Sequence, residues 1–193
     1  MKKNNLVYDI RQISTIRELI ETSADEFGAR PAFVLKKDGE IYEHNYRAVI
    51  SEVRALSTYF NSKGLEGKRI AVIGENRFEW NLAYLAVTCG TGVVVPLDKA
   101  LPANEIESLI IRSGVEAIIY SKNYDEVMKN IKSRSTTDLR YYISMDLEEK
   151  QDGVLSLYEL VEKGKKLLAD GNTKFLDAKI DAEKMGIMLF TSG

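Results

Sequence analysis

The chain has 193 residues, of which 45% are hydrophobic and 29% are charged. This composition is typical of a globular domain and excludes a disordered, collagen-like or low-complexity chain. The formal net charge of −2 argues against a protein that binds nucleic acid through bulk charge. The single cysteine, Cys89, cannot form an internal disulfide, and the first ten residues lack the apolar run of a signal peptide. A cytoplasmic protein is therefore expected.

The N-terminal part of the chain predicts a helix followed by a hairpin. Residues 1–13 are expected to form a flexible N-terminus. Thr15-Ile16-Arg17-Glu18 has the pattern of a capping box, and apolar residues at helical spacing continue from it to Gly28. Two short strands are then expected at 32–36 and 40–44, because Asp38-Gly39 between them suits a tight turn.

From residue 45 onwards, helical and strand patterns alternate. Asn45, Asn76, Asn123 and Ser156 are expected to cap helices, and Glu79, Glu126 and Glu159 complete three of these caps. In order, the expected elements are helix 46–63, strand 69–73, helix 77–88, strand 93–95, helix 102–113, strand 117–120, helix 124–131, strand 140–144, helix 157–168, a helical turn 181–184 and strand 186–190. This order predicts an α/β fold with a mostly parallel sheet flanked by helices.

The residues from Trp80 to Leu97 include no charged side chain, and the stretch is almost long enough to cross a membrane. Polar and turn residues interrupt it, notably Gly90-Thr91-Gly92. A buried helix, a turn and a buried strand are expected here, with no transmembrane segment.

Few residues suggest catalysis by themselves. His44 is the only histidine and is expected to lie on the surface at a strand end, whereas Cys89 is expected to be a buried, unreactive thiol. No residues have the spacing of a zinc site. We therefore expect no catalytic and no metal-binding residue in this chain.

Three turns could hold a phosphate group. Gly74-Glu75-Asn76 follows a strand, but it has one glycine and a carboxylate that would repel phosphate. Gly90-Thr91-Gly92 precedes a strand and is expected to be a tight turn. Thr191-Ser192-Gly193 follows an apolar strand and supplies hydroxyl groups with a permissive glycine, as a phosphate-binding loop does at its start. Because the chain stops there, we expect it to be truncated.

Several segments, in the right order and spacing from about residue 14 to the end, together resemble the superfamily of adenylate-forming enzymes: acyl-CoA synthetases, luciferases and adenylation domains. The matching segments are Asn45-Tyr46 through Gly64 (Asn stands where the family usually has Thr), Gly67-Lys68-Arg69-Ile70-Ala71-Val72 with Asn76, Glu79 and Trp80, Ala86 with Gly90, Gly92, Val93, Val95, Pro96 and Leu97, Leu101-Pro102-Ala103-Asn104-Glu105-Ile106, and Phe190-Thr191-Ser192-Gly193. Leu101-Pro102 and residues 155–168 favour the long-chain fatty acyl-CoA synthetases within it.

The resemblance implies that residues 1–193 are the N-terminal portion of an AMP-binding domain, cut at the start of the phosphate loop. The parent enzyme would use ATP, Mg²⁺ and coenzyme A to activate a carboxylic acid, which we expect to be a fatty acid. Thr191, Ser192 and Gly193 would begin the loop that binds the ATP phosphates. The isolated chain is expected to be inactive and to self-associate through apolar surface. The parent enzyme could also associate peripherally with the inner face of the membrane.

Two other interpretations remain. The parent enzyme could adenylate another carboxylate, such as an aryl or amino acid. Alternatively, the chain could be a non-enzymatic α/β binding module, similar to a receiver domain, in which Glu75 and Asp98 form an acidic metal pocket after two strands.

Overall fold

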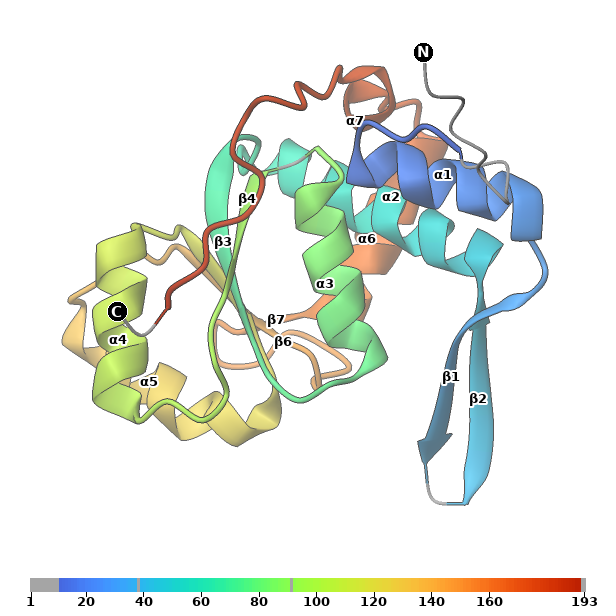
Figure 1. The fold of residues 1–193 in the computed structure, drawn as a ribbon. Coiled ribbons are helices and arrows are strands. Elements are labelled where there is room, and N and C mark those ends of the chain that lie inside the picture. Colours follow the sequence, from blue (N-terminus) through green and yellow to red (C-terminus); the bar gives the residue numbers. More distant parts are fainter. Residues whose placement is uncertain (1–10, 38, 91, 192–193) are drawn as a thin grey trace, which may run out of the picture.

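A computed structural model of the chain describes residues 11–37, 39–90 and 92–191 (Figure 1). The helices are α1 (Ile16–Phe27), α2 (Tyr46–Ser62), α3 (Phe78–Thr88), α4 (Ala103–Ser113), the 3-10 turn η1 (Lys122–Tyr124), α5 (Asp125–Arg134), α6 (Leu157–Ala169) and α7 (Lys174–Asp177). The strands are β1 (Pro31–Lys37), β2 (Glu40–Asn45), β3 (Lys68–Ile73), β4 (Gly92–Pro96), β5 (Ala117–Tyr120), β6 (Tyr141–Ser144) and β7 (Leu155–Ser156).

Five strands form a parallel sheet in the order β4-β3-β5-β6-β7. Ile70 of β3 lies opposite Val94 of the edge strand β4 and Ala117 of the central strand β5. The first two strands pair antiparallel in a separate hairpin that projects away from the sheet (Figure 1). The expected α/β fold with a mostly parallel sheet is confirmed.

Helices cover both faces of this sheet, and each face has its own hydrophobic core. Ile70 and Val72 face the core that α1, α2, α3, α6 and α7 close. Ala71 and Ile73, which alternate with them along β3, face a second core under α4 and α5. Because both faces of β3 are buried, its sequence is apolar without alternation, as the strand pattern predicted.

Three of the five expected helix caps are confirmed. The side chains of Thr15, Asn45 and Ser156 accept hydrogen bonds from backbone N–H groups in the first turns of α1, α2 and α6. The two caps expected at Asn76 and Asn123 are wrong. Arg77 occupies the N-cap position of α3 without a side-chain cap, and Asn123 lies within η1. Both asparagines are therefore displaced from the position at which a cap can form.

The C-terminal region departs from the expected pattern. The polar connection after α6 contains the short helix α7, whose Phe175 side chain is fully buried. The predicted strand 186–190 is reduced to one parallel bridge between Ile187 and Val94. This segment, red in Figure 1, leaves β4 and ends beside α4, where the Phe190 ring lies 5.7 Å from the Arg112 guanidinium.

The uncharged stretch from Trp80 to Leu97 contains most of α3 and the whole of β4, as expected. Among the described residues, no helix combines the length and the apolar character needed to cross a bilayer.

Candidate functional site

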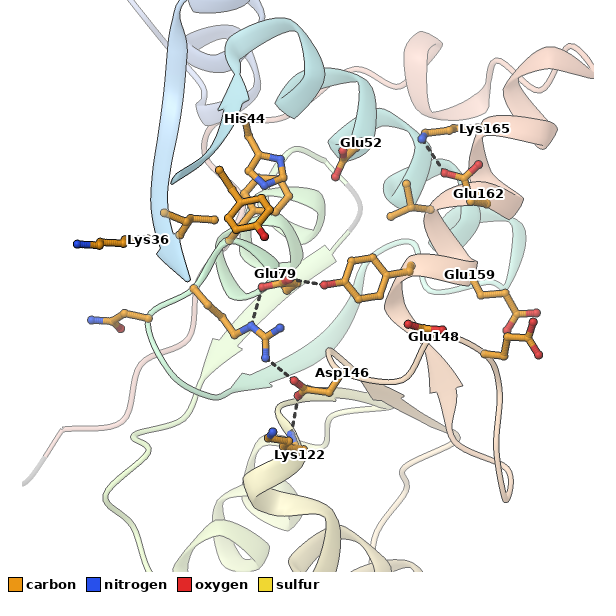
Figure 2. A pocket seen from close by; sticks show the side chains of 18 residues that line it. Lys36, His44, Glu52, Glu79, Lys122, Asp146, Glu148, Glu159, Glu162 and Lys165 are labelled. Atoms are coloured by element: carbon orange, nitrogen blue, oxygen red, sulfur yellow. Dashed lines mark hydrogen bonds and ion pairs between the residues drawn. The ribbon is translucent and has the colours of Figure 1, made fainter. Parts of the chain in front are cut away.

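The ends of β3, β5 and β6 come together around the side chain of Arg77. Its Nε donates to Glu79 Oε2 and one terminal nitrogen donates to Asp146 Oδ1, and both hydrogen bonds are 2.6 Å long (Figure 2, dashed lines). The other oxygen of Asp146 accepts the backbone N–H of Lys122 at 2.7 Å. One guanidinium group thus joins the start of α3 to the loops that follow two neighbouring strands.

Glu79 extends this network to α6. The Tyr158 hydroxyl donates to Glu79 Oε1, so that both carboxylate oxygens of Glu79 are engaged. Burial alone would raise the pKa of Glu79, but the hydrogen bonds from Arg77 and Tyr158 outweigh it and lower that pKa below its ordinary value. Burial and the bond to Glu79 raise the pKa of Tyr158, so its hydroxyl remains a proton donor at neutral pH.

A cleft of about 930 Å³ opens beside this network, between the hairpin, the start of α3 and α6. Its carboxylates outnumber its cationic side chains, which makes it a poor place for a phosphate group. The acidic residues are Glu52, Glu79, Asp146, Glu148, Glu149, Glu159 and Glu162, and the basic ones are Lys36, Arg77, Lys122 and Lys165. Burial, reinforced by the neighbouring Glu162 and Glu79, raises the pKa of Glu52, although Lys165 opposes the shift.

His44 lies in the wall of this cleft and not on the open surface that the sequence suggested. Its imidazole stacks on the Phe78 ring, with ring centroids 3.5 Å apart. Burial lowers the pKa of His44, while the charge of Glu79 acts in the opposite direction. The neutral imidazole is therefore the form that packs against Phe78, and no hydrogen bond ties it to a nucleophile in the described part of the chain.

Cys89 is fully buried at the C-terminal end of α3, as expected. Burial raises the pKa of its thiol to about 12, so it stays protonated at physiological pH. A protonated, inaccessible thiol is a poor nucleophile, and Cys89 acts as a small core residue.

The two acidic residues considered as a metal pocket have separate partners. Glu75 Oε1 accepts a hydrogen bond from Asn123 Nδ2 at 2.5 Å, and Asp98 Oδ1 accepts one from the backbone N–H of Ala100 at 2.9 Å. Within the described ranges, no three histidine, cysteine, aspartate or glutamate side chains are grouped so that they could hold a metal ion.

The three candidate phosphate turns differ in what surrounds them. Gly74 packs against Ser121, and Gly90 packs against Ile180, so neither glycine faces an open loop. Thr91 lies outside the described residues. Thr191 is exposed and follows the segment bridged to β4, whereas Ser192 and Gly193 also lie outside the described residues.

Arg77, Asp146 and Tyr158 were not singled out by the sequence. A signal was nevertheless present, because Arg77 and Asp146 each follow a predicted strand and the carboxyl ends of parallel strands share one edge of the sheet. The partnership with Tyr158 depends on how α6 packs, which no local pattern encodes.

Comparison with known proteins decides the family. The model of the AMP-binding enzyme family matches residues 20–193. The chain belongs to the AMP-binding enzyme family. The resemblance noted in the sequence is thereby confirmed, and the five-stranded parallel sheet is the expected part of that family's fold.

The proteins to which this chain is similar in sequence include acyl-CoA ligases. The mitochondrial medium-chain acyl-CoA ligase of Mus musculus is 24% identical over 143 residues, covering 74% of this chain and 22% of that protein. The crotonobetaine/carnitine–CoA ligase of Salmonella paratyphi A is 19% identical over 187 residues, covering 96% of this chain and 35% of that protein. The chain thus spans about a fifth to a third of the length of these relatives.

A solved fatty-acid–CoA ligase shows the same fold. The long-chain-fatty-acid–CoA ligase of Archaeoglobus fulgidus superposes with a TM-score of 0.75 at 17% identity, over 95% of this chain and 35% of that one. At this identity the likeness extends to the fold alone, and the substrate has to be argued separately.

Proposed function

We propose that the complete protein is an acyl-CoA ligase that activates a fatty acid, and that residues 1–193 are the N-terminal portion of its AMP-binding domain. The observation that carries this proposal is the family match over residues 20–193, together with relatives that are acyl-CoA ligases. A carboxylate oxygen of the acid would attack the α-phosphorus of ATP, and pyrophosphate would leave. The coenzyme A thiol would then attack the acyl carbon and displace AMP.

Thr191, Ser192 and Gly193 are proposed to begin the loop that binds the ATP phosphates. Thr191 suits this role because its side chain is exposed and its backbone follows a segment held by β4. Backbone N–H and hydroxyl donors at such a turn offset the negative charge of phosphate oxygens. Mg²⁺ would enter with ATP and neutralise phosphate charge, since it commonly reaches such sites through substrate phosphates and few protein ligands.

A long-chain fatty acid is the substrate we propose first, on the sequence of Leu101-Pro102 and of residues 155–168. A second candidate is a short or polar carboxylate. The similarity to a crotonobetaine/carnitine–CoA ligase over 96% of this chain favours including that class.

The test is a carboxylate panel on the protein made from the complete reading frame. Palmitate, octanoate, crotonobetaine and benzoate would each be mixed with ATP, Mg²⁺ and coenzyme A, and pyrophosphate release and thioester formation would be measured. We expect thioester with palmitate at the highest kcat/KM. Thioester with another acid alone would redirect the substrate assignment, and no pyrophosphate release with any acid would contradict the ligase proposal.

Two comparisons make this test specific. Residues 1–193 alone are expected to release no pyrophosphate, because the loop they begin is incomplete. In the complete protein, Thr191→Ala is expected to lower kcat/KM for ATP by about tenfold or more. Thr173→Ala is the matched control, since Thr173 is another exposed threonine and makes no side-chain cap.

A further inference from the structure

Residues 178–191, which we call the connector, lead from α7 to the proposed phosphate loop. The connector contains no helix or strand among its described residues, so its position depends on a few attachments. Near its far end, Val94 N donates to Gly186 O at 3.0 Å and Met188 N donates to Val94 O at 2.9 Å. Ile180 packs over Gly90, where an added Cβ would lie 3.1 Å from the Ile180 Cγ1 atom.

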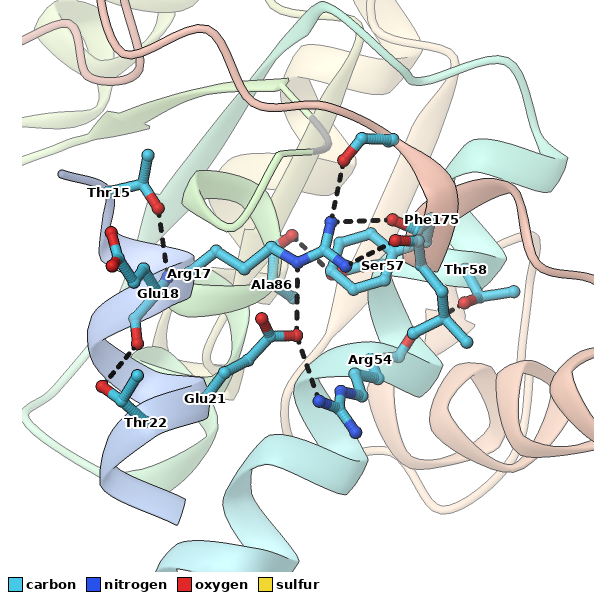
Figure 3. Close-up of polar contacts among 12 residues, drawn as sticks. Thr15, Arg17, Glu18, Glu21, Thr22, Arg54, Ser57, Thr58, Ala86 and Phe175 are labelled. Atoms are coloured by element: carbon cyan, nitrogen blue, oxygen red, sulfur yellow. Dashed lines mark hydrogen bonds and ion pairs between the residues drawn. The ribbon is translucent and has the colours of Figure 1, made fainter. Parts of the chain in front are cut away.

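The near end of the connector is held by Arg17 of α1. One terminal nitrogen of Arg17 donates to the carbonyl oxygens of Phe175 at 2.8 Å and Ala178 at 3.2 Å. The other terminal nitrogen donates to Leu176 O at 3.0 Å. Figure 3 shows this guanidinium reaching from α1 to the backbone around Phe175. Arg17 thus binds three carbonyl groups located about 160 positions later in the chain.

Arg17 is buried, with 8% of its surface exposed. Its guanidinium carbon lies 4.4 Å from the centroid of the Phe175 ring, which is itself fully buried. Glu21 balances the charge through a 3.3 Å contact to Arg17 Nε, and the same Glu21 oxygen contacts Arg54 of α2 at 3.1 Å. A buried guanidinium that is both paired and hydrogen-bonded is a rigid anchor, because losing any partner would leave charge desolvated.

The short helix α7 needs this anchor. It has four residues, and a helix of that length does not persist through its own hydrogen bonds. Its C-terminal carbonyls carry partial negative charge, which the guanidinium satisfies. Without Arg17, α7 and the near end of the connector would depend on Phe175 packing and Ile180 packing, whereas the far end is also held by the β-bridge and by Met188 and Phe190, which pack against the second core.

We propose that Arg17 is a positioning residue for the nucleotide site. By fixing α7 and the start of the connector, it sets the place and direction in which Thr191 and the following loop approach ATP. This inference rests on the proposed function. Since small misplacements of phosphate-binding groups weaken nucleotide binding strongly, Arg17 acts on ATP affinity without touching ATP.

The experiment compares Arg17→Met, Arg17→Lys and Arg11→Met in the complete protein. Arg11 is the matched control, because it is an exposed arginine whose ion pair with Glu26 and hydrogen bonds to Thr22 and Ser23 are all made to α1. Arg17→Met is expected to raise KM for ATP about tenfold, with KM for the fatty acid and kcat changing less than about threefold. Arg17→Lys should restore part of the loss, because an ammonium group can bind one or two of the carbonyls. Arg11→Met should behave as the wild type.

Hydrogen exchange measured without ATP tests directly whether Arg17 holds α7 and the connector in place. In Arg17→Met, the hydrogen-bonded backbone amides of Asp177, Ala178 and Met188 should exchange at least about tenfold faster, while those of β5 should be unchanged. If Arg17→Met does not fold, KM for ATP and hydrogen exchange are measured on Arg17→Lys instead. Unchanged exchange in the connector, or unchanged KM for ATP in an active enzyme, would overturn the inference and leave the proposed function intact. A wild-type protein that turns over no ATP would remove the proposed function itself, and this inference with it.

Discussion

The guanidinium group of Arg77 and the carboxylate of Asp146 lie 2.6 Å apart, although 69 positions separate the two residues in the sequence. The pair is only partly exposed, with side-chain exposures of 28% and 21%. It connects the start of α3 to the end of β6 and, through Lys122, to the end of β5. The edge of the sheet at which parallel α/β folds usually bind ligands is thereby held by one ion-pair network.

Replacing Arg77 with methionine should destabilise the fold. The change leaves Glu79 and Asp146 half-buried without their counter-charge, and we expect the free energy of unfolding to fall by about 1–3 kcal/mol. Urea denaturation of residues 1–193 would measure it. Arg134→Met is the control, since the Arg134 side chain pairs with Glu107 and is 51% exposed. Losing this ion pair should lower the free energy of unfolding by less than about 1 kcal/mol. Equal losses in the two variants would contradict a special role for Arg77.

Stability should fall in two steps on acidification. The pKa of His44 is lowered in the fold, so the unfolded chain takes up a proton first and stability begins to fall below the ordinary pKa of 6.5. The pKa of Glu79 is also lowered, so its contribution is present above its ordinary pKa of 4.5 and is lost as the pH falls through the lower folded value. Urea midpoints at pH values from 7 to 3 would show both steps. His44→Gln should remove the first step. Glu79→Gln should reduce the second step without removing it, because the pKa values of Glu75, Glu107, Glu116 and Glu159 are lowered as well.

Gly164 of α6 is expected to be intolerant of any side chain. An added Cβ would lie 1.9 Å from the carbonyl oxygen of Ala55 in α2, so the two helices would have to move apart. Gly164→Ala should lower the free energy of unfolding by about 1–3 kcal/mol, even though alanine favours the helix itself. Gly186→Ala is the control, because its added Cβ would have no atom of the described residues within 4 Å apart from those of its two chain neighbours. A melting temperature unchanged by Gly164→Ala would show that the helices adjust freely.

Cys89 should be unreactive in the folded protein. Burial and a thiol pKa of about 12 both suppress the thiolate that attacks disulfide reagents. We expect no colour from a thiol-specific disulfide reagent at pH 8 within an hour, and one equivalent at once in denaturant. Rapid reaction without denaturant would indicate that the end of α3 opens readily.

Self-association remains a proposal for residues 1–193. Val34 and Ile41 on the hairpin are 60% and 68% exposed, and register places them on the same face of the two strands. Sedimentation velocity should show the weight-average mass rising with concentration, because this apolar surface can pair between copies. Ile41→Lys should reduce that rise, whereas a wild-type monomer at every concentration would count against the proposal.

The sequence by itself determined the alternating helices and strands, the parallel sheet and the family. These follow from local signals: apolar runs in β3 and β5, the caps at Thr15, Asn45 and Ser156, and an ordered series of short motifs. The tertiary structure alone decided the partners of Arg17, Arg77 and Glu79, and it reduced the strand at residues 186–190 to a single bridge. The physical reason is that ion pairs, buried carbonyl contacts and an edge-strand register depend on groups far apart in the chain. Side-chain type and spacing along the sequence do not specify which of these distant groups come into contact.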